Sequence, residues 1–253
     1  ELPEGVDYAI PYDVNNRGVI IGEAGLASGS WDVAPILWDP SPRLLPVPEL
    51  PYQEGAVSSS INDRGDVSGT YYHWNLENYN GWQFRNGEFA LFPEFSWSGN
   101  INNHGVATGG ERRDGQYSAG TWVDGKLVPL PERGNAVPWF IDDRGRLAGF
   151  VRSGDYLTYA AKWASVDSPA QVRYDLHESI YEAVGANGAL AGRFTLRSTL
   201  YNFYELNGVT TVLPDTLPWL PSISGIDGYG RVIATLYDDF YNQRGLIWSG
   251  GDW

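Results

Sequence analysis

The sequence predicts an all-β protein, and three observations support that prediction. The chain of 253 residues contains 31 Gly and 16 Pro, a composition typical of many short strands joined by tight turns. Aromatic residues are abundant, with 16 Tyr and 11 Trp. A ten-residue pattern, spelled SINDRGDVSG at 60–69, recurs along the chain, and no helical pattern separates its copies.

Six copies of this pattern recur at a nearly constant interval, and a glycine marks each copy. The marking residues are Gly18, Gly65, Gly105, Gly145, Gly188 and Gly230. They are spaced 47, 40, 40, 43 and 42 residues apart. Repeats of about 40–50 residues without helices are typical of β-propeller blades. We therefore predict a six-bladed β-propeller of four-stranded antiparallel blades, forming a single domain over residues 1–253. The expected repeats are 8–51, 52–95, 96–134, 135–178, 179–219, and 220–253 together with 1–7.

The first strand of each repeat precedes the recurrent turn, and the second strand follows it. The first strand should end at an aliphatic residue, namely Val14, Ile61, Ile101, Ile141, Val184 or Ile226. Asn or Asp opens the turn in five repeats, because its side chain can accept a backbone hydrogen bond two residues on. Glycine closes the turn, where a positive φ is needed. The second strand carries Ile20, Val67, Ala107, Leu147, Leu190 or Val232 two residues after that glycine. A further Gly or Ala, four residues after the turn glycine, should let a neighbour pack closely.

The third strand should supply one large ring to the core of each repeat. These rings are Trp38, Phe84, Trp122, Trp163, Tyr204 and Trp248. The fourth strand should end in a Pro-acid signature, found at 47–49, 92–94, 130–132 and 213–215, because proline is tolerated at a sheet edge. The last repeat lacks this signature, but Leu2-Pro3-Glu4 carries it. We therefore expect the N-terminal segment to add the fourth strand of the last blade and close the ring.

This succession of an apolar residue, Asn, Asn or Asp, Gly and Val, then a Trp strand and a Leu-Pro-acid end, resembles the HAF-type probable extracellular repeat. The resemblance covers essentially the whole chain and is clearest over 8–178. The chain departs from the pattern at Gly185, Ala186 and Ala234. The resemblance implies a propeller-like fold and export, so that an extracellular or periplasmic location is expected. It implies no catalytic residue.

Charge and composition exclude several classes of partner. The net charge of −14 argues against nucleic acid, which needs a basic face. No apolar run approaches the ~18 residues of a membrane helix, so membrane insertion is not expected. The chain has no Cys and therefore no thiol chemistry. Its first ten residues show neither the basic nor the apolar stretch of a signal peptide, as in a processed form. We expect a monomer.

The candidate ligand-binding residues fall into two groups. Loops that join second to third strands vary in sequence and are rich in rings, and variable loops on a rigid scaffold often bind ligands. This group contains Trp31, Tyr72, His73, Trp74, Tyr156 and Tyr237. First strands should line a central channel, and their side chains should alternate between two faces, with Ser58 and Ser60 sharing one of them. From these strands we select Asp13, Asn100, Trp139 and Glu182.

These residues favour a binding module for carbohydrate or a protein surface, because rings stack on sugars and are enriched at protein interfaces. The alternative is a hydrolase or lyase acting on an extracellular polymer, with acids such as Asp13 and Glu182 at the channel mouth. A third interpretation is a structural scaffold, with the rings filling gaps between loops. The three His lie in different repeats and show no metal-ligand spacing. No cofactor is expected, although a Ca²⁺ ion held by carbonyls and Asp13 stays open.

Overall fold

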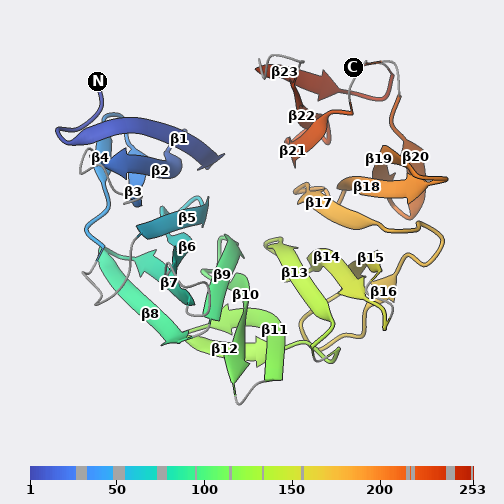
Figure 1. Cartoon of the computed structure of the whole chain (residues 1–253), viewed down its shortest axis with the longest axis horizontal. Helices are drawn as coiled ribbons and strands as arrows, with labels where there is room; N and C mark the ends of the chain where they lie inside the picture. Colours follow the sequence, from blue (N-terminus) through green and yellow to red (C-terminus); the bar gives the residue numbers. More distant parts are fainter. Residues whose placement is uncertain are drawn as a thin grey trace. The chain divides into compact units, whose positions relative to one another are not determined.

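The computed structural model (Figure 1) describes residues 1–26, 33–47, 55–72, 79–94, 96–113, 116–132, 134–154, 157–214, 217, 220–237, 243–251 and 253. Every regular element in these ranges is a β-strand, which confirms the predicted all-β class. The strands belong to two compact halves, Glu1–Gly134 and Asn135–Trp253, and each half is described separately.

The N-terminal half contains three groups of four antiparallel strands. The first group is β1 (Val6–Val14), β2 (Ile20–Leu26), β3 (Val33–Trp38) and β4 (Pro42–Leu44); the second is β5 (Gly55–Ile61), β6 (Val67–Tyr72), β7 (Tyr79–Arg85) and β8 (Glu88–Glu94). The third is β9 (Ser96–Ile101), β10 (Ala107–Arg113), β11 (Gln116–Val123) and β12 (Lys126–Pro129). A single parallel pair, Val33 with Gly55, joins the first two groups.

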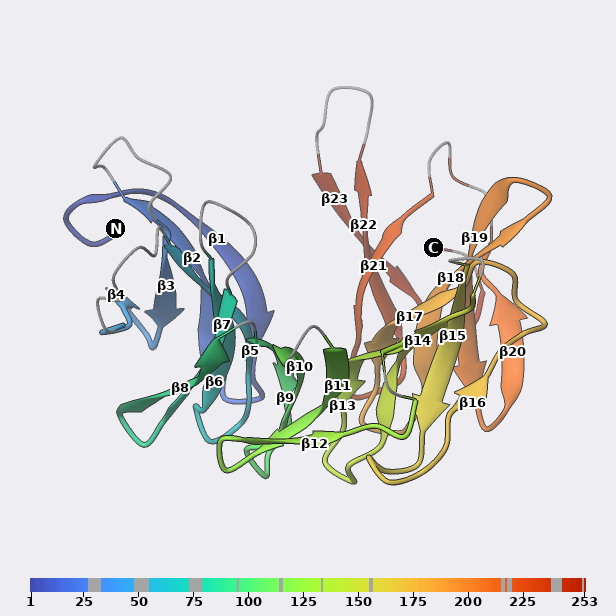
Figure 2. The ribbon, with the colours of Figure 1, turned by 60° about the horizontal axis from the view of Figure 1, so that its bottom comes forward.

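The C-terminal half contains two four-stranded sheets and one three-stranded sheet among the described residues. The first is β13 (Ala136–Ile141), β14 (Leu147–Arg152), β15 (Thr158–Trp163) and β16 (Gln171–Val172). The second is β17 (Ile180–Val184), β18 (Leu190–Leu196), β19 (Thr199–Leu206) and β20 (Val209–Val212), and its strands can be followed side by side in Figure 2. The third is β21 (Ser222–Ile226), β22 (Val232–Tyr237) and β23 (Gln243–Trp248).

The recurrent turn has the predicted geometry. First strands end, and second strands begin, at the predicted residues in all six repeats. In the second repeat, Asn62 Oδ1 accepts hydrogen bonds from the N–H groups of Arg64 (3.0 Å) and Asp66 (2.9 Å), and Gly65 has a φ of 87°. Asn15, Asn102, Asp142 and Asp227 accept the same pair of bonds. The fifth repeat has Gly185 at this position, and there Asn187 accepts a bond from the N–H of Ala189 instead.

Neighbouring turns of the N-terminal half are also bonded to one another. Asn15 Nδ2 donates to the carbonyl of Asn62 (2.9 Å), and Asn62 Nδ2 donates to the carbonyl of Asn102 (2.8 Å). One position further on, Asp63 accepts bonds from Asn16 and Asn103 side chains. The same side chains therefore shape each turn and tie it to the next repeat.

Asn62→Ala should lower the free energy of unfolding by about 2–3 kcal/mol, because it leaves buried backbone N–H and C=O groups without partners. Asn62 is only 4% exposed, and its amide also donates to Asp66. Urea denaturation followed by Trp fluorescence measures the loss. Asn16→Ala is the control: Asn16 is exposed, so its loss should stay below about 1 kcal/mol. Equal losses in both variants would contradict this account of the turn.

Each first strand contains a β-bulge, which the sequence did not predict. In the second repeat Ser58 pairs with Gly69, whereas Ser60 pairs with Ser68, the residue next to Gly69 on a regular strand. Ser58 and Ser60 therefore lie on opposite faces, and the predicted alternation is wrong. The same register shift occurs in β1, β9, β13, β17 and β21. The bulge brings the first strand close to the second: a Cβ on Gly69 would lie 2.2 Å from the carbonyl oxygen of Val57. The predicted close approach at this glycine is thus confirmed.

The ring of the third strand lies opposite the first residue of the second strand in five repeats, but not in the fifth. Trp122 pairs with Ala107 and Trp163 with Leu147, and both rings are buried. In the fifth repeat Leu190 pairs with Glu205, and Tyr204 lies one position off. Tyr204 still packs against a core cluster, as predicted, with its ring 5.2 Å from that of Trp248, but it lies one position away from the register of the other repeats. A buried carboxylate, 2% exposed, stands where the other repeats have an aromatic ring.

The fourth strands are edge strands, as predicted, since β8, β12, β16 and β20 each pair with one neighbour. Phe92, Leu130 and Leu213 of the Pro-acid signatures are buried beneath them. The predicted strand at Leu2-Pro3-Glu4 is absent: these residues precede β1, and the carbonyl of Pro3 accepts a bond from the N–H of Val6. Among the described residues, β23 pairs only with β22.

Candidate functional site

Half of the predicted ligand-binding residues have no described side chain. Trp31, His73, Trp74 and Tyr156 lie outside the described residues. Tyr72 is the last residue of β6, and its backbone pairs with Tyr79 at the start of β7. Of the cluster predicted at 72–74, Tyr72 thus ends β6, and the other two residues follow it in the sequence outside the described part of the chain.

The predicted residues Tyr237, Trp139 and Glu182 lie in the C-terminal half. Tyr237 ends β22 and is exposed. Trp139 and Glu182 occupy the bulges of β13 and β17. The Trp139 ring packs edge-on against Phe150 at 5.0 Å.

Glu182 is the predicted residue with a perturbed acidity. Burial raises the pKa of Glu182, while the positive charge of Arg193, whose Nε lies 3.1 Å from Glu182 Oε1, opposes the rise. A carboxyl with a raised pKa can hold a proton closer to neutral pH than an exposed one.

The structure brings Asp13 and Asn100 together through Ser60. The Ser60 hydroxyl donates to Asp13 Oδ2 (2.8 Å), and Asn100 Nδ2 donates to Ser60 Oγ (3.1 Å). Asp13 also accepts bonds from the N–H groups of Val14 and Ile61. These contacts link the first strands of three repeats. They give Asp13 a structural role, and a Ca²⁺ ion there stays a prediction. Within the described residues, no three or more His, Asp or Glu side chains are grouped as a metal site would need.

A pocket of about 310 Å³ lies in the N-terminal half, beside the β6–β7 connection. Its lining contains the hydroxyl residues Ser59, Thr70 and Ser98, the aromatic residues Tyr79 and Trp97, and Gly99. The Trp97 indole donates to the hydroxyl of Tyr117 (2.6 Å), which fixes the ring. Ser59 Oγ donates to the carbonyl of Ser98 (3.0 Å).

The hydroxyl of Ser98 is the unusual group of this pocket. Ser98 is 2% exposed, and its Oγ has no hydrogen-bond partner among the described residues. A buried hydroxyl without a partner costs free energy. Less than 1 Å² of the Ser98 Oγ is accessible, so a ligand would bond to it, and recover that free energy, only after a shift of the pocket wall. Ser98 is not among the predicted site residues, because nothing in the sequence indicates which hydroxyl of the first strands lacks a partner.

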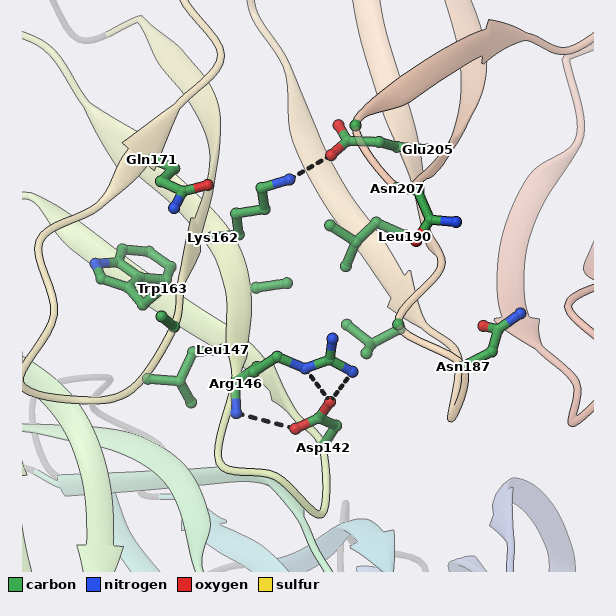
Figure 3. Close-up of a pocket in the computed structure, with 15 residues that line it drawn as sticks. Asp142, Arg146, Leu147, Lys162, Trp163, Gln171, Asn187, Leu190, Glu205 and Asn207 are labelled. Atoms are coloured by element: carbon green, nitrogen blue, oxygen red, sulfur yellow. Dashed lines mark hydrogen bonds and ion pairs between the residues drawn. The ribbon is translucent and has the colours of Figure 1, made fainter.

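A second pocket, of about 250 Å³, lies within the C-terminal half between the sheets β13–β16 and β17–β20 (Figure 3). Turn residues of both sheets line it, including Asp142, Arg146, Asn187 and Asn207. It thus lies at the turns between first and second strands and between third and fourth strands. The sequence analysis predicted ligand contacts in the loops that join second to third strands instead, because these turns are short and uniform.

Glu205 is the centre of a charged network beside this second pocket. Lys162 and Arg173 form ion pairs with its two oxygens, and the hydroxyl of Tyr181 donates to Oε2 (2.9 Å). Burial alone would raise the pKa of Glu205, but the bonds from Lys162 and Tyr181 and the nearby positive charges outweigh burial and lower it. Burial and the charge of Glu205 raise the pKa of Tyr181. Glu205 is therefore an ionised, fully bonded carboxylate in the core.

The sequence contained one signal for this network. The fifth repeat lacks Trp or Phe at the position opposite Leu190 and has an acid there. Because the neighbouring Tyr204 is aromatic, the repeat pattern alone does not reveal that an acid stands opposite Leu190.

Comparisons with known proteins identify the fold. No family model matches the sequence, and neither does any curated protein sequence. Among solved structures, the β-propeller domain of the Trilobed protease from Pyrococcus furiosus, described as having an open velcro topology, is similar over 96% of both chains (11% identity, TM-score 0.52). An acylaminoacyl peptidase of Pyrococcus horikoshii is similar over 98% of this chain and 46% of its own (9% identity, TM-score 0.66). This chain thus spans less than half of that peptidase.

A lectin also belongs to these similar structures. The SapL1 lectin, solved in complex with alpha methyl fucoside, is similar over 98% of this chain and 95% of its own (8% identity, TM-score 0.55). At these identities the likeness concerns the fold. The chain has a β-propeller type of fold, which occurs both in lectins and in proteins with peptidase activity. No helix in the described part of the chain has the length and hydropathy required to cross a membrane.

Proposed function

We propose that this protein is a carbohydrate-binding module and that the pocket beside the β6–β7 connection receives one sugar ring. The observation that carries the proposal is a pocket whose lining combines Trp97 and Tyr79 with three hydroxyl residues, one of which, Ser98, has a hydroxyl with no hydrogen-bond partner among the described residues. Sugars present apolar faces that stack on rings and hydroxyls that exchange hydrogen bonds. A lectin with a similar fold and a bound fucoside supports the same class of ligand.

The size and position of the pocket agree with this ligand. Its volume of about 310 Å³ lies at the lower end of the roughly 300–1,000 Å³ typical of small-molecule sites. Tyr79 follows directly on the 73–78 connection, to which His73 and Trp74 belong. His73 and Trp74, with Tyr72, stay predicted ligand contacts from the sequence. A protein surface is the other ligand that such a ring-rich loop suits.

A glycan array of the purified chain tests the proposal, and calorimetry then measures the affinity. Trp97→Ala should weaken binding of the selected glycan by about tenfold or more, since a ring at the centre of a contact contributes ~2 kcal/mol. Tyr174→Ala is the control, because Tyr174 is an exposed ring of the C-terminal half and should leave the affinity unchanged.

A pair of serine variants separates binding from folding. Ser98→Ala removes a hydroxyl without a protein partner, so it should weaken glycan binding and leave the free energy of unfolding unchanged or raised. Ser58→Ala removes a buried hydroxyl that donates to the carbonyl of Gly22, so it should lower stability and leave the affinity unchanged. If no glycan binds, or if Ser98→Ala binds as tightly as the parent chain, the proposed site is wrong.

Glu182 favours a second candidate function, hydrolysis or elimination on an extracellular polymer. Its raised pKa suits a proton donor. The same array distinguishes the two functions, because release of shortened products would indicate an enzyme, whereas binding without turnover indicates a lectin.

We further propose that the sheets are blades of one six-bladed propeller. Six repeats with one recurrent turn and the fold comparisons support this number. Since residues 2–4 form no strand, an open arrangement like that named for the Trilobed protease domain is one form that this propeller can take. Export and a monomeric state complete the proposal and follow from the HAF-type resemblance and the repeat architecture. An experimental structure with another number of blades would exclude it.

A further inference from the structure

The pocket between the sheets β13–β16 and β17–β20 has no role in the proposed glycan site, which belongs to the other half of the chain. We propose that this second pocket binds a small ligand through a carboxylate group. The charged residues that line it differ in how far their hydrogen-bond donors and acceptors are used within the protein.

The acceptor capacity of the two acids in the pocket is used within the protein. Asp142 Oδ1 accepts bonds from the N–H groups of Arg144 and Arg146, and Oδ2 accepts a bond from Arg146 Nε (2.6 Å). Glu205 Oε1 accepts a hydrogen bond from Lys162, and Oε2 accepts hydrogen bonds from Arg173 and Tyr181. The side chains of Asp142 and Glu205 are only 9% and 3% exposed. Neither acid is open to a ligand.

The donor capacity of the two basic residues is not used up. Lys162 has three N–H donors and gives one of them, to Glu205. Arg146 has five N–H donors, and its guanidinium group approaches Asp142 with the Nε and Nη2 atoms. Their side chains are 29% and 37% exposed, several times more than those of the acids they pair with. Figure 3 shows Lys162 and Arg146 on one sheet, whereas the amide of Asn187 on the facing sheet points away from them. Among the charged groups of the wall, the unused hydrogen-bonding capacity therefore consists of N–H donors on Lys162 and Arg146.

A carboxylate is the ligand group that matches an excess of N–H donors. It accepts up to four hydrogen bonds, and bonds from charged donors are stronger than neutral ones. Leu147, Val184 and Leu190 provide an apolar surface for the rest of the ligand. The volume of about 250 Å³ admits one sugar ring or a short aliphatic chain. The carboxylate can therefore come from an acidic sugar or from a simple organic acid.

The charged network of this pocket depends on Glu205, the acid that replaces an aromatic ring in the fifth repeat. An aromatic ring at position 205 would bury about 150–250 Å² of surface, as Trp163 does in the neighbouring repeat, and would leave no partner for Lys162. Glu205 instead holds Lys162 and Arg173 in place. The ligand would thus meet a basic side chain whose position is fixed before binding.

Calorimetric titration of the full chain with D-glucuronate, acetate and D-glucose tests this inference. Glucuronate should bind at least about tenfold more tightly than glucose, which has the same ring without the charge. Binding of acetate as well would identify the carboxylate alone as sufficient, whereas its failure to bind would identify an acidic sugar. Both results support the proposal. Equal affinity for glucose and glucuronate, or no binding of either carboxylate, would overturn it.

Two variants locate the binding to this pocket. Lys162→Gln should weaken glucuronate binding by about tenfold or more, and Lys126→Gln, the same change at an exposed residue of β12, should not. Ala164→Trp places a large side chain at an exposed position of the pocket lining and should abolish binding even if Lys162→Gln fails to fold. Unchanged affinity in Ala164→Trp would show that glucuronate binds elsewhere.

Discussion

Gly192→Ala should lower the free energy of unfolding of the C-terminal half by at least about 3 kcal/mol, among the largest effects of a single methyl group. An added Cβ would lie 2.0 Å from the carbonyl oxygen of Ile180 and 3.0 Å from the Cα of Tyr181. Both obstacles belong to backbone, so no side-chain rotation relieves the clash. The bulged strand β17 would have to move away from β18, and the bonds around Glu205 would be strained with it.

Chemical denaturation followed by Trp fluorescence measures this effect. Gly245→Ala is the matched control, because Gly245 also lies in a strand of the C-terminal half, β23, but an added Cβ would meet no atom within 4 Å. That variant should be as stable as the parent chain or more stable by about 0.5 kcal/mol, since glycine weakens a strand. Similar losses at Gly192 and Gly245 would show that the close approach of β17 and β18 is unimportant.

Glu205→Ala should cost about 3–5 kcal/mol, because removing one partner of a buried ion pair leaves the other charge uncompensated. Here Lys162 and Arg173 would both lose their shared carboxylate, and Tyr181 would lose the acceptor for its hydroxyl. Asp167→Ala removes an exposed acid of the same half and should change stability by less than about 0.5 kcal/mol. Urea denaturation of both variants makes the comparison.

The dependence of this effect on pH gives an independent check. The pKa of Glu205 is lower in the folded chain than the usual value, so the folded state favours the ionised form. Its contribution to stability is therefore complete above the usual Glu pKa of about 4.3 and is lost as the pH falls through the folded pKa. The stability difference between the parent chain and Glu205→Gln should shrink in that acidic range. A difference that is constant down to low pH would contradict the ionised network.

The strand order and the strand ends were predictable because turn chemistry is local. Asn62, Gly65 and Val67 determine one turn within six residues, and the same spelling recurs in the other repeats. The bulges were not predictable from alternation, since the extra residue in a strand such as Ser59 has no distinctive chemistry. Only the glycine opposite it, Gly69, indicates that two backbones approach closely.

The site was less accessible to sequence reasoning than the fold. Asp13 and Asn100 do lie together, as their positions in first strands suggested, but their contacts through Ser60 are structural. The two pockets arise where side chains from different strands meet, and their key groups are an unpartnered hydroxyl at Ser98 and a carboxylate at Glu205. A burial state or a missing hydrogen bond is a property of the packed chain, so it cannot be inferred from residue spacing.

The bonds between successive turns bear on how such a chain can evolve. Asn15 donates to the backbone of Asn62, and Asn62 donates to the backbone of Asn102, so that each repeat presents an acceptor to the repeat before it and a donor to the repeat after it. A duplicated repeat inserted at this point would find matching neighbours on both sides at once. Gene duplication can thus lengthen the array by whole repeats without a compensating substitution.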